Sequence, residues 1–310
     1  MGKIATATDI DASGGGPGPV GVTADRRAIG PWARAWQRFR GNKLALGSLI
    51  FCGLLIVLAL LAPVLAPQHY AETDFANLLA PPGQGGHLFG TDQLGRDILS
   101  RLLFGLRTAL TVAFGAELTA LVFALVIGLV AGYVGGRVET VLMAFTDVMY
   151  AFPAYLFAVI MVTVLGRSVF ALIIAIGIAS WVTQARLVRA QVLTLKEREY
   201  VEAARSMGAG GVTIAVRYIL PNAIGPILVT TSFAIPAAIA AEAGLALLGL
   251  GVQPPTPSWG AMITDGTRNL LSAPHMLVFP AFLFALTLLA FTWLGDGVRD
   301  AFDAAGEERG

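Results

Sequence analysis

Charged residues are scarce in this sequence. Lys, Arg, Asp and Glu together make up 13% of its 310 residues, while 56% are hydrophobic, and a typical soluble domain has about 25% charged residues. A soluble fold could not hide that much apolar surface from water, so the composition excludes an ordinary soluble domain. The net charge of +1 says little about partners, because in a membrane protein the distribution of charge matters more than its sum.

Cysteine is nearly missing, and the common catalytic motifs are absent. The single Cys52 lies inside an apolar run, so it can form neither a disulfide framework nor a metal cluster. The sequence contains no G-x-x-x-x-G-K-[ST] phosphate-binding loop, no G-x-S-x-G nucleophile motif and no H-E-x-x-H zinc motif. The chain therefore cannot bind ATP through a P-loop, and driven transport would need a partner or an ion gradient as its energy source.

Long uncharged runs dominate what is present. Residues 44–66 form a run of 23 without a charge, and residues 276–294 form a run of 19. A bilayer core about 30 Å thick is crossed by about 20 residues of helix, at about 1.5 Å per residue. The sequence therefore predicts an all-α protein embedded in the lipid bilayer. Six transmembrane helices are expected, at about 44–66, 108–133, 141–165, 168–187, 224–250 and 276–295.

The basic residues predict the orientation of these spans. With the N-terminus in the cytoplasm, 16 of the 21 Lys and Arg residues fall in cytoplasmic segments and 5 in outer segments. Because Lys and Arg concentrate on the cytoplasmic side of membrane proteins, both termini are expected there. The domain plan is a disordered tail over 1–25, a basic interfacial helix over 26–43, the six-span domain over 44–303 and a C-terminal tail over 304–310.

Two long loops are expected on the outer side, over 67–107 and 251–275. Apolar residues at helical spacing from Ile98 to Leu106 predict a separate amphipathic helix on the outer surface that leads into the second span. Prolines are expected to stiffen the second loop. All three histidines fall in these loops, where surface histidines are ordinary, and a metal site would need the loops to converge: they are His69, His87 and His275.

Three acidic residues fall within predicted spans. Glu117 is expected near mid-membrane, Asp147 toward the cytoplasmic side and Glu242 toward the outer side. Acids in lipid are costly and mark either a transport pathway or a hydrogen bond to a neighbouring helix, and the sequence leaves both readings open. Three acids at three depths without a partnering histidine make a poor proton relay. Prolines at Phe152-Pro153 and at Pro236 predict breaks or kinks in the third and fifth spans.

A polar insert over 190–222 separates the fourth and fifth spans on the predicted cytoplasmic side. We expect a first helix over 196–206 that ends at Met207-Gly208, because glycine accepts the backbone conformation of a helix terminus. Gly210 and Gly211 are expected to turn the chain, and a second helix over 212–219 should end before Pro221. The small pair Ala203-Ala204 would let another protein approach the backbone, so the insert is expected to dock into a partner's groove.

Five segments in order along the chain resemble the permease subunits of binding-protein-dependent ABC importers. The resemblance is to the dipeptide/oligopeptide (peptide/nickel) branch, in its second-permease form. The cytoplasmic signature of that family, E-A-A, three residues, G, then ten residues and I-L-P, matches the insert. The segments are FGTDQLGRDILSRLLFGLRTAL (89–110), DVMYAFP (147–153), ARLVRAQVLTLKEREYVEAARSMGA (185–209), GLGVQPPTPSWGAM (249–262) and LGDGVRDAFD (294–303).

The resemblance implies a type I ABC importer permease fold and half of a translocation pathway for short peptides. It implies a homologous second permease as heterodimer partner, two ATPase subunits that hold ATP and Mg, and an extracytoplasmic binding protein, in a bacterial or archaeal plasma membrane. The chain itself would be no enzyme, would bind no cofactor or metal, and would have no nucleic-acid partner. The residues implied to couple to the ATPase are Glu202, Ala203, Ala204, Arg205, Gly208, Ala209, Leu220 and Pro221.

Three other functions remain open at this point. Some members of the same branch carry nickel or another small solute, and the permease sequence discriminates poorly between substrates. An ion-driven secondary transporter would use Glu117 and Asp147 as its relay and would need no ATPase. A polytopic membrane enzyme would lack any recognisable nucleophile or metal motif.

Overall fold

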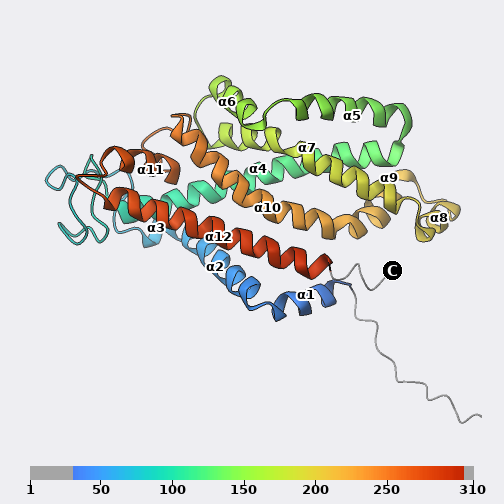
Figure 1. Ribbon diagram of the computed structural model, residues 1–310, viewed down its shortest axis with the longest axis horizontal. Helices are drawn as coiled ribbons and strands as arrows, with labels where there is room; N and C mark the ends of the chain where they lie inside the picture. Colours follow the sequence, from blue (N-terminus) through green and yellow to red (C-terminus); the bar gives the residue numbers. More distant parts are fainter. Residues whose placement is uncertain (1–30, 304–310) are drawn as a thin grey trace, which may run out of the picture.

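The computed structural model describes residues 31–303, which are almost entirely helical (Figure 1). In chain order the helices are α1 (Pro31–Gly41), α2 (Lys43–Leu60), α3 (Ala62–Leu65), α4 (Ile98–Val134), α5 (Gly136–Ala151), α6 (Ala154–Leu165), α7 (Val169–Leu195), α8 (Glu199–Ser206), α9 (Gly211–Thr213), a π-helix (Ile214–Ile219), α10 (Leu220–Leu247), α11 (Trp259–Arg268) and α12 (His275–Asp303). The tails expected over 1–25 and 304–310 lie outside the described residues.

Five helical segments are long and apolar enough to cross a membrane: Lys43–Leu60, Ile98–Val134, Val169–Leu195, Gly211–Leu247 and His275–Phe302. A sixth crossing is present if α5 and α6 count as one broken span. The all-α membrane fold is therefore confirmed.

The third predicted span, 141–165, is not one helix. Its two halves, α5 and α6, are bent by 87° at Phe152-Pro153. Phe152 has an extended backbone, with φ −83° and ψ 129°, which is the conformation that a following proline imposes. The break predicted at Phe152-Pro153 in this span is therefore confirmed.

In the outer segments, one expectation is corrected and one loop contains a helix that was not predicted. The stretch from Ile98 to Leu106 is no separate surface helix, because it is the first part of the 37-residue helix α4. No proline or glycine pair interrupts it, so helical hydrogen bonding continues into the second span. The loop 251–275 contains the helix α11, whose N-cap is Ser258, a residue that accepts a hydrogen bond from the backbone N–H of Ala261.

The core is built around the close pairing of α4 and α7. A Cβ atom on Gly128 would lie 2.6 Å from Cβ of Val188 and 2.7 Å from the carbonyl oxygen of Ala185. Gly177 of α7 meets α4 in the same way, because a Cβ atom added to it would lie 2.8 Å from the carbonyl oxygen of Ala116. Apolar surface gives little attraction between helices in lipid, so helices associate there through such close packing of small residues.

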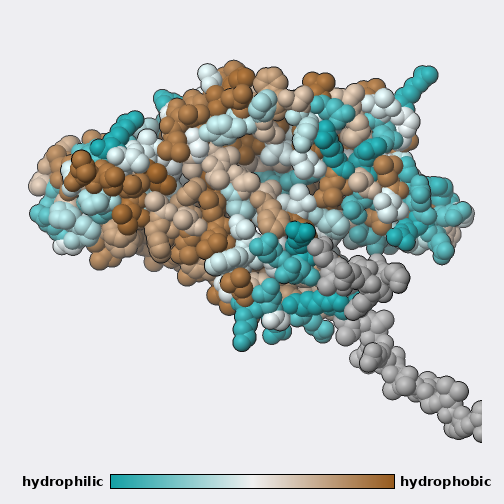
Figure 2. Space-filling model, in the orientation of Figure 1, coloured by the Kyte–Doolittle hydropathy of each residue, from teal (hydrophilic) through white to brown (hydrophobic). Residues whose placement is uncertain are grey.

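The bundle has two different ends. Figure 1 shows α1, α8, α9 and the last turns of α12 at one end, and α11 with the 66–97 loop at the opposite end. Figure 2 shows hydrophilic side chains gathered around α8 and α1 and hydrophobic ones along the helices between the two ends. This arrangement keeps the insert on the same side of the bundle as the described ends of the chain.

The helix α1 is anchored on the protein by one face. Ala35 and Phe39 are buried with Ala45 of α2 and Ala301 of α12. The ring of Trp32 meets Phe302 edge-on, with 5.5 Å between centroids. The described part of the basic segment expected over 26–43 therefore packs against both α2 and α12.

We predict that Gly128→Ala destabilises the folded chain by about 1–3 kcal/mol, because the added methyl overpacks the α4–α7 contact. The measurement is the thermal unfolding of the detergent-purified protein. The matched control is Gly53→Ala on α2, where no atom lies within 4 Å of the new Cβ. Equal melting temperatures for the two variants would contradict the assigned role of Gly128.

Candidate functional site

The insert folds as a short helix followed by a tight glycine turn. The helix α8 begins after Arg198 and ends at Met207. Gly208 has φ +84°, and the N–H of Ala209 donates to the carbonyl oxygen of Ala204 at 3.0 Å. This is the six-to-one hydrogen bond of a Schellman helix end. The predicted stop at Met207-Gly208 is confirmed, although the helix starts at Glu199 rather than at residue 196.

One face of α8 is buried inside the protein. Val201 and Ala204 are fully covered, and Val201 belongs to one apolar cluster with Ile214, Ile219 and Val192. Ala204 therefore cannot be reached by a partner, and the prediction that both alanines form an exposed docking surface is wrong for this residue. Ala203 is exposed, because consecutive residues of a helix point about 100° apart.

The second half of the insert is continuous with the fifth span. The helix over 212–219 does not end before Pro221: α9 and the π-helix lead directly into α10, with Pro221 in its first turn. Pro221 has no N–H to donate to the preceding turn, so one helical hydrogen bond is missing where the π-helix meets α10. Of the glycines in the insert, Gly208 has a positive φ and Gly210, at −68°, has an ordinary one. The turn therefore rests on Gly208.

The remaining predicted coupling residues lie on an exposed surface. Beside them, Met207 is 76% exposed and Val212 is 80% exposed, which is unusual for such large apolar side chains. At the base of the insert, the ammonium group of Lys196 donates to the carbonyl oxygen of Gly132 at 3.0 Å. Glu202, Ala203, Arg205, Gly208 and Pro221 are exposed, and Ala209 and Leu220 are half-buried.

Asp147 is a structural link between α5 and α7. Its carboxylate accepts a hydrogen bond of 2.6 Å from Arg186, whose guanidinium also stacks over the ring of Tyr150 at 4.1 Å. About two turns before Asp147 on α5, Glu139 accepts a hydrogen bond of 2.7 Å from Nε of Arg189. Both acids of α5 thus have an arginine partner on α7.

Glu117 and Glu242 lie in different surroundings. Glu117 of α4 is 5% exposed, and the amide nitrogen of Gln184 donates to both of its carboxylate oxygens, at 2.9 and 3.0 Å. Glu242 of α10 is buried, and its Oε1 has no hydrogen-bond partner among the described residues. The three predicted acids do not contact one another, so they are not assembled as a relay.

Glu117 opens onto a cavity of about 240 Å³ between α4, α6, α7 and α10. The wall is smooth, and most of it consists of alanine side chains. The other lining residues are Ala154, Tyr155, Ala158, Ile176, Ala179, Ser180, Ala234, Ala237, Ala238 and Ala241. The cavity is thus lined by small side chains and one acid.

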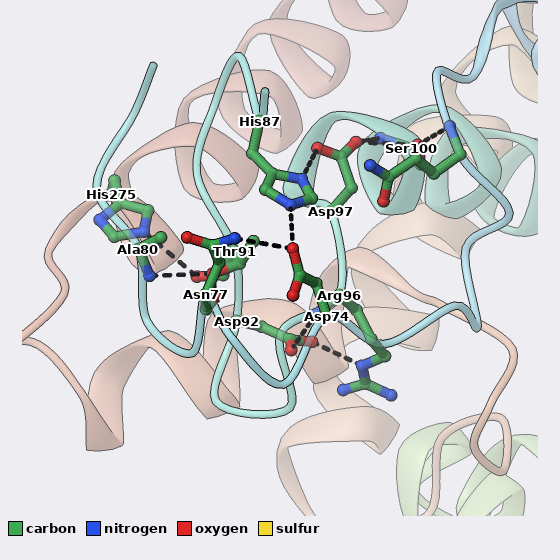
Figure 3. A network of polar contacts seen from close by, with 11 residues as sticks. Asp74, Asn77, Ala80, His87, Thr91, Asp92, Arg96, Asp97, Ser100 and His275 are labelled. Carbon is green, nitrogen blue, oxygen red and sulfur yellow. Dashed lines mark hydrogen bonds and ion pairs between the residues drawn. The ribbon is translucent and has the colours of Figure 1, made fainter. Parts of the chain in front are cut away.

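The 66–97 loop at the opposite end is held by a buried polar network (Figure 3). His87 is completely buried; its Nδ1 lies 3.0 Å from Asp97, and its Nε2 lies 3.6 Å from Asp74. Hydrogen bonds from the Asn77 side chain and the Ala76 N–H hold the pKa of Asp74 below its usual value. The sequence suggested that His87 is an ordinary surface histidine, and its burial shows that this prediction is wrong.

The two outer loops do converge, through His275. Its Nε2 lies 3.3 Å from the carbonyl oxygen of Thr91, and its side chain is nearly buried, so this histidine too is structural (Figure 3). Even so, nowhere in residues 31–303 do three or more His, Cys, Asp or Glu side chains form a group that could hold a metal ion.

Two family models match the chain. One, described as "Binding-protein-dependent transport system inner membrane component", matches residues 124–305. The chain belongs to this family. The other, "N-terminal TM domain of oligopeptide transport permease C", matches residues 30–82 of the permease.

Individual relatives agree with this assignment. The permease is 42% identical over 273 residues to the oligopeptide transport system permease protein OppC of Escherichia coli K12, covering 88% of this chain and 90% of the relative. It is 46% identical over 275 residues, with the same two coverages, to the glutathione transport system permease protein GsiD of Shigella flexneri serotype 5b. These relatives are transport permeases, not enzymes.

A solved structure of the methionine ABC transporter MetNI, in an inward-facing conformation, shares the fold. The match has a TM-score of 0.54 at 17% identity and covers 66% of the permease and 97% of the MetNI chain. The type I ABC importer permease fold is thereby confirmed.

Sequence reasoning missed the residues that surround Glu117. Gln184 and Tyr155 carry no motif, and their roles depend on which helices face each other. The Asp147–Arg186 pair was also missed, although a basic residue near the same depth on the next span was a usable signal.

We predict that Asp97→Ala loosens the 66–97 loop, whereas Asp97→Asn largely preserves it. Asp97 caps α4 by accepting hydrogen bonds from the N–H and the hydroxyl of Ser100, at 2.7 and 2.8 Å, and it faces buried His87. Loss of such a cap costs about 0.5–2 kcal/mol. The measurement is limited proteolysis of the loop in the purified protein. Equal cleavage rates in both variants would contradict the capping role.

Proposed function

We propose that this permease forms half of the translocation pathway of an ATP-driven importer for short peptides, and that it couples to a separate ATPase through residues 199–221. The observation that carries the proposal is the mechanical continuity of the insert. Its exposed face belongs to α8 and the Gly208 turn, its buried face packs on α7, and its second half runs into α10. A push on the exposed face therefore reaches two helices that line the cavity.

The substrate class rests on the relatives. One relative is a permease of an oligopeptide transport system, and the other is a permease of a glutathione transport system. Each matches 88% of this chain. Nickel or another small solute remains the alternative substrate of the same machine, without a structural feature that favours it. A secondary transporter is less well supported, because Glu117 and Asp147 have separate partners.

The remaining parts of the machine follow from the family. A homologous second permease would complete the pathway, two ATPase subunits would bind ATP and Mg, and an extracytoplasmic binding protein would deliver the peptide. We infer a bacterial or archaeal plasma membrane, with both termini and the insert in the cytoplasm. The common end of the bundle shared by α1, α8 and the end of α12 supports this orientation (Figure 1).

The proposed coupling is mechanical. Closure of the ATPases on ATP would move α8, and the buried contacts of Val201 would carry that motion to α7 and the π-helix. A π-helix has a wider hydrogen-bonding pattern than an α-helix and is common at functional sites. Pro226 and Pro236 inside α10 leave backbone carbonyl groups without helical donors, so that helix can bend beside the cavity.

We predict that Gly208→Val uncouples ATP hydrolysis from uptake while membrane insertion stays intact. A β-branched residue is strained at φ +84°, and the left-handed conformation costs about 1–2 kcal/mol, so the turn should shift. The measurement is the ratio of peptide uptake to ATP hydrolysis in proteoliposomes that contain the whole transporter.

The matched control is Gly210→Val. Both glycines are exposed and have no atom within 4 Å of an added Cβ, but Gly210 has an ordinary φ of −68°. Uptake by Gly208→Val at the level of Gly210→Val would show that the turn has no coupling role.

We predict that Glu202→Lys weakens ATPase binding without changing the fold of the insert. Glu202 is exposed and lies in the first turn of α8, so a lysine reverses the charge offered to the partner. The measurement is the amount of ATPase that co-purifies with the permease, together with cross-linking from Ala203→Cys. Unchanged co-purification and uptake would exclude this face as the docking surface.

A further inference from the structure

Glu117 is an acid without a basic partner. It lies in the middle part of α4, 5% exposed, and its hydrogen-bond partners in residues 31–303 are the uncharged side chains of Gln184 and Thr231, with no ion pair. An acid within a transmembrane segment is expensive and is usually paired with a basic group or placed on a transport pathway. Asp147 and Glu139 follow the first course, because each has its own arginine on α7. Glu117 has no such arginine.

Glu117 is instead placed on the cavity between α4, α6, α7 and α10. It is the one charged residue among the eleven that line this space, and eight of the other ten are alanine or isoleucine. The hydroxyl of Ser180 already donates to the carbonyl oxygen of Ile176 at 2.8 Å. A carboxylate in such a wall is the strongest electrostatic feature that a bound solute would meet.

The size of the cavity suits part of a ligand. Pockets that enclose a whole drug-sized molecule have volumes of about 300–1,000 Å³, whereas this one has about 240 Å³. One end of a peptide would therefore fit here, while the rest would face the second half of the pathway.

An unsatisfied acceptor beside Glu117 points to a donor-bearing ligand. The amide oxygen of Gln184 is buried and has no hydrogen-bond partner among the described residues. The hydroxyl of Thr231 on α10 lies next to the Glu117 carboxyl group and is a donor to it. Buried polar atoms normally have partners. An ammonium group brings three donors and a positive charge, which matches a carboxylate beside a free amide oxygen, and the Tyr155 ring of the cavity wall adds a cation–π contact.

We propose that Glu117 is a specificity-determining contact for a primary ammonium group of the transported substrate. This inference rests on the proposed function. The group is either the N-terminal ammonium of a peptide or the ammonium of a lysine side chain, which offer the same chemistry. Glu117 forms the charged hydrogen bond, and the free amide oxygen of Gln184 beside it accepts a second donor.

The test is Glu117→Gln in the assembled transporter, with its second permease, ATPases and binding protein. This substitution keeps the size of the side chain and removes its charge. Uptake is compared for trialanine, for N-acetyl-trialanine and for N-acetyl-Ala-Lys-Ala. The readout is the ratio of variant to wild-type uptake for each peptide, since selection by the unchanged binding protein cancels in that ratio.

Uptake of trialanine should fall roughly tenfold to a hundredfold, as expected for loss of a charge-assisted hydrogen bond, and uptake of N-acetyl-trialanine should change less than about twofold. A large loss for N-acetyl-Ala-Lys-Ala would show that a side-chain ammonium is also read, and its absence would restrict the contact to the N-terminus. Equal losses for trialanine and N-acetyl-trialanine, or no loss for either, would overturn the proposal.

A second measurement bypasses the binding protein, in case it rejects acetylated peptides. Saturation-transfer NMR of the same peptides on the purified transporter without binding protein should show contact for trialanine that Glu117→Gln abolishes. No contact in the wild type would also overturn the proposal. The matched control, Glu242→Gln, changes a buried acid outside the cavity and should treat acetylated and free peptides alike.

The outcomes also separate this inference from the function beneath it. ATP-dependent peptide uptake by the wild type, with a Glu117→Gln variant that loses trialanine and N-acetyl-trialanine uptake equally or loses neither, contradicts the Glu117 contact alone. Absence of ATP-dependent peptide uptake in the wild-type assembly contradicts the proposed function itself.

Discussion

The close approach of α4 and α7 is the contact on which the rest of this permease depends. Gly128 and Gly132 on α4 and Gly177 on α7 let the two backbones meet where a Cβ atom would collide with the opposite helix. In lipid, where apolar surface alone gives no preference for one neighbour, this close fit selects the partner helix. The same contact sets Glu117 opposite Gln184, and it fixes the base of the insert where Lys196 reaches Gly132.

From that pair the structure extends in two functional directions. Toward the insert, α7 ends beside α8, and the buried face of α8 joins it to the start of α10. Toward the membrane centre, α4, α7 and α10 surround the cavity together with α6. Because the same helices serve both places, a displacement of the insert and a change in the cavity wall are mechanically linked. A separate signalling element between them is not required.

The sequence predicted the helical membrane fold and its crossings because long apolar runs depend on composition alone. It also predicted the stop of α8, since Gly208 supplies a backbone conformation that other residues avoid. It failed where the direction of a side chain decided the outcome. Ala204 was expected to be exposed, although its spacing of three residues from Val201 places both on one helical face. His87 was expected on the surface, and its burial depends on loop contacts that no local pattern encodes.

The intramembrane acids show why an arrangement of neighbours matters more than the residue itself. Asp147 and Glu117 look alike in the sequence, each an acid in an apolar run. In the fold, Asp147 is neutralised by Arg186 and ties α5 to α7, whereas Glu117 receives an uncharged amide and faces open space. A chain that supplies arginines to the acids of α5 but none to the acid of its cavity leaves that charge to be balanced by something that enters. For a transporter, the entering group is the substrate.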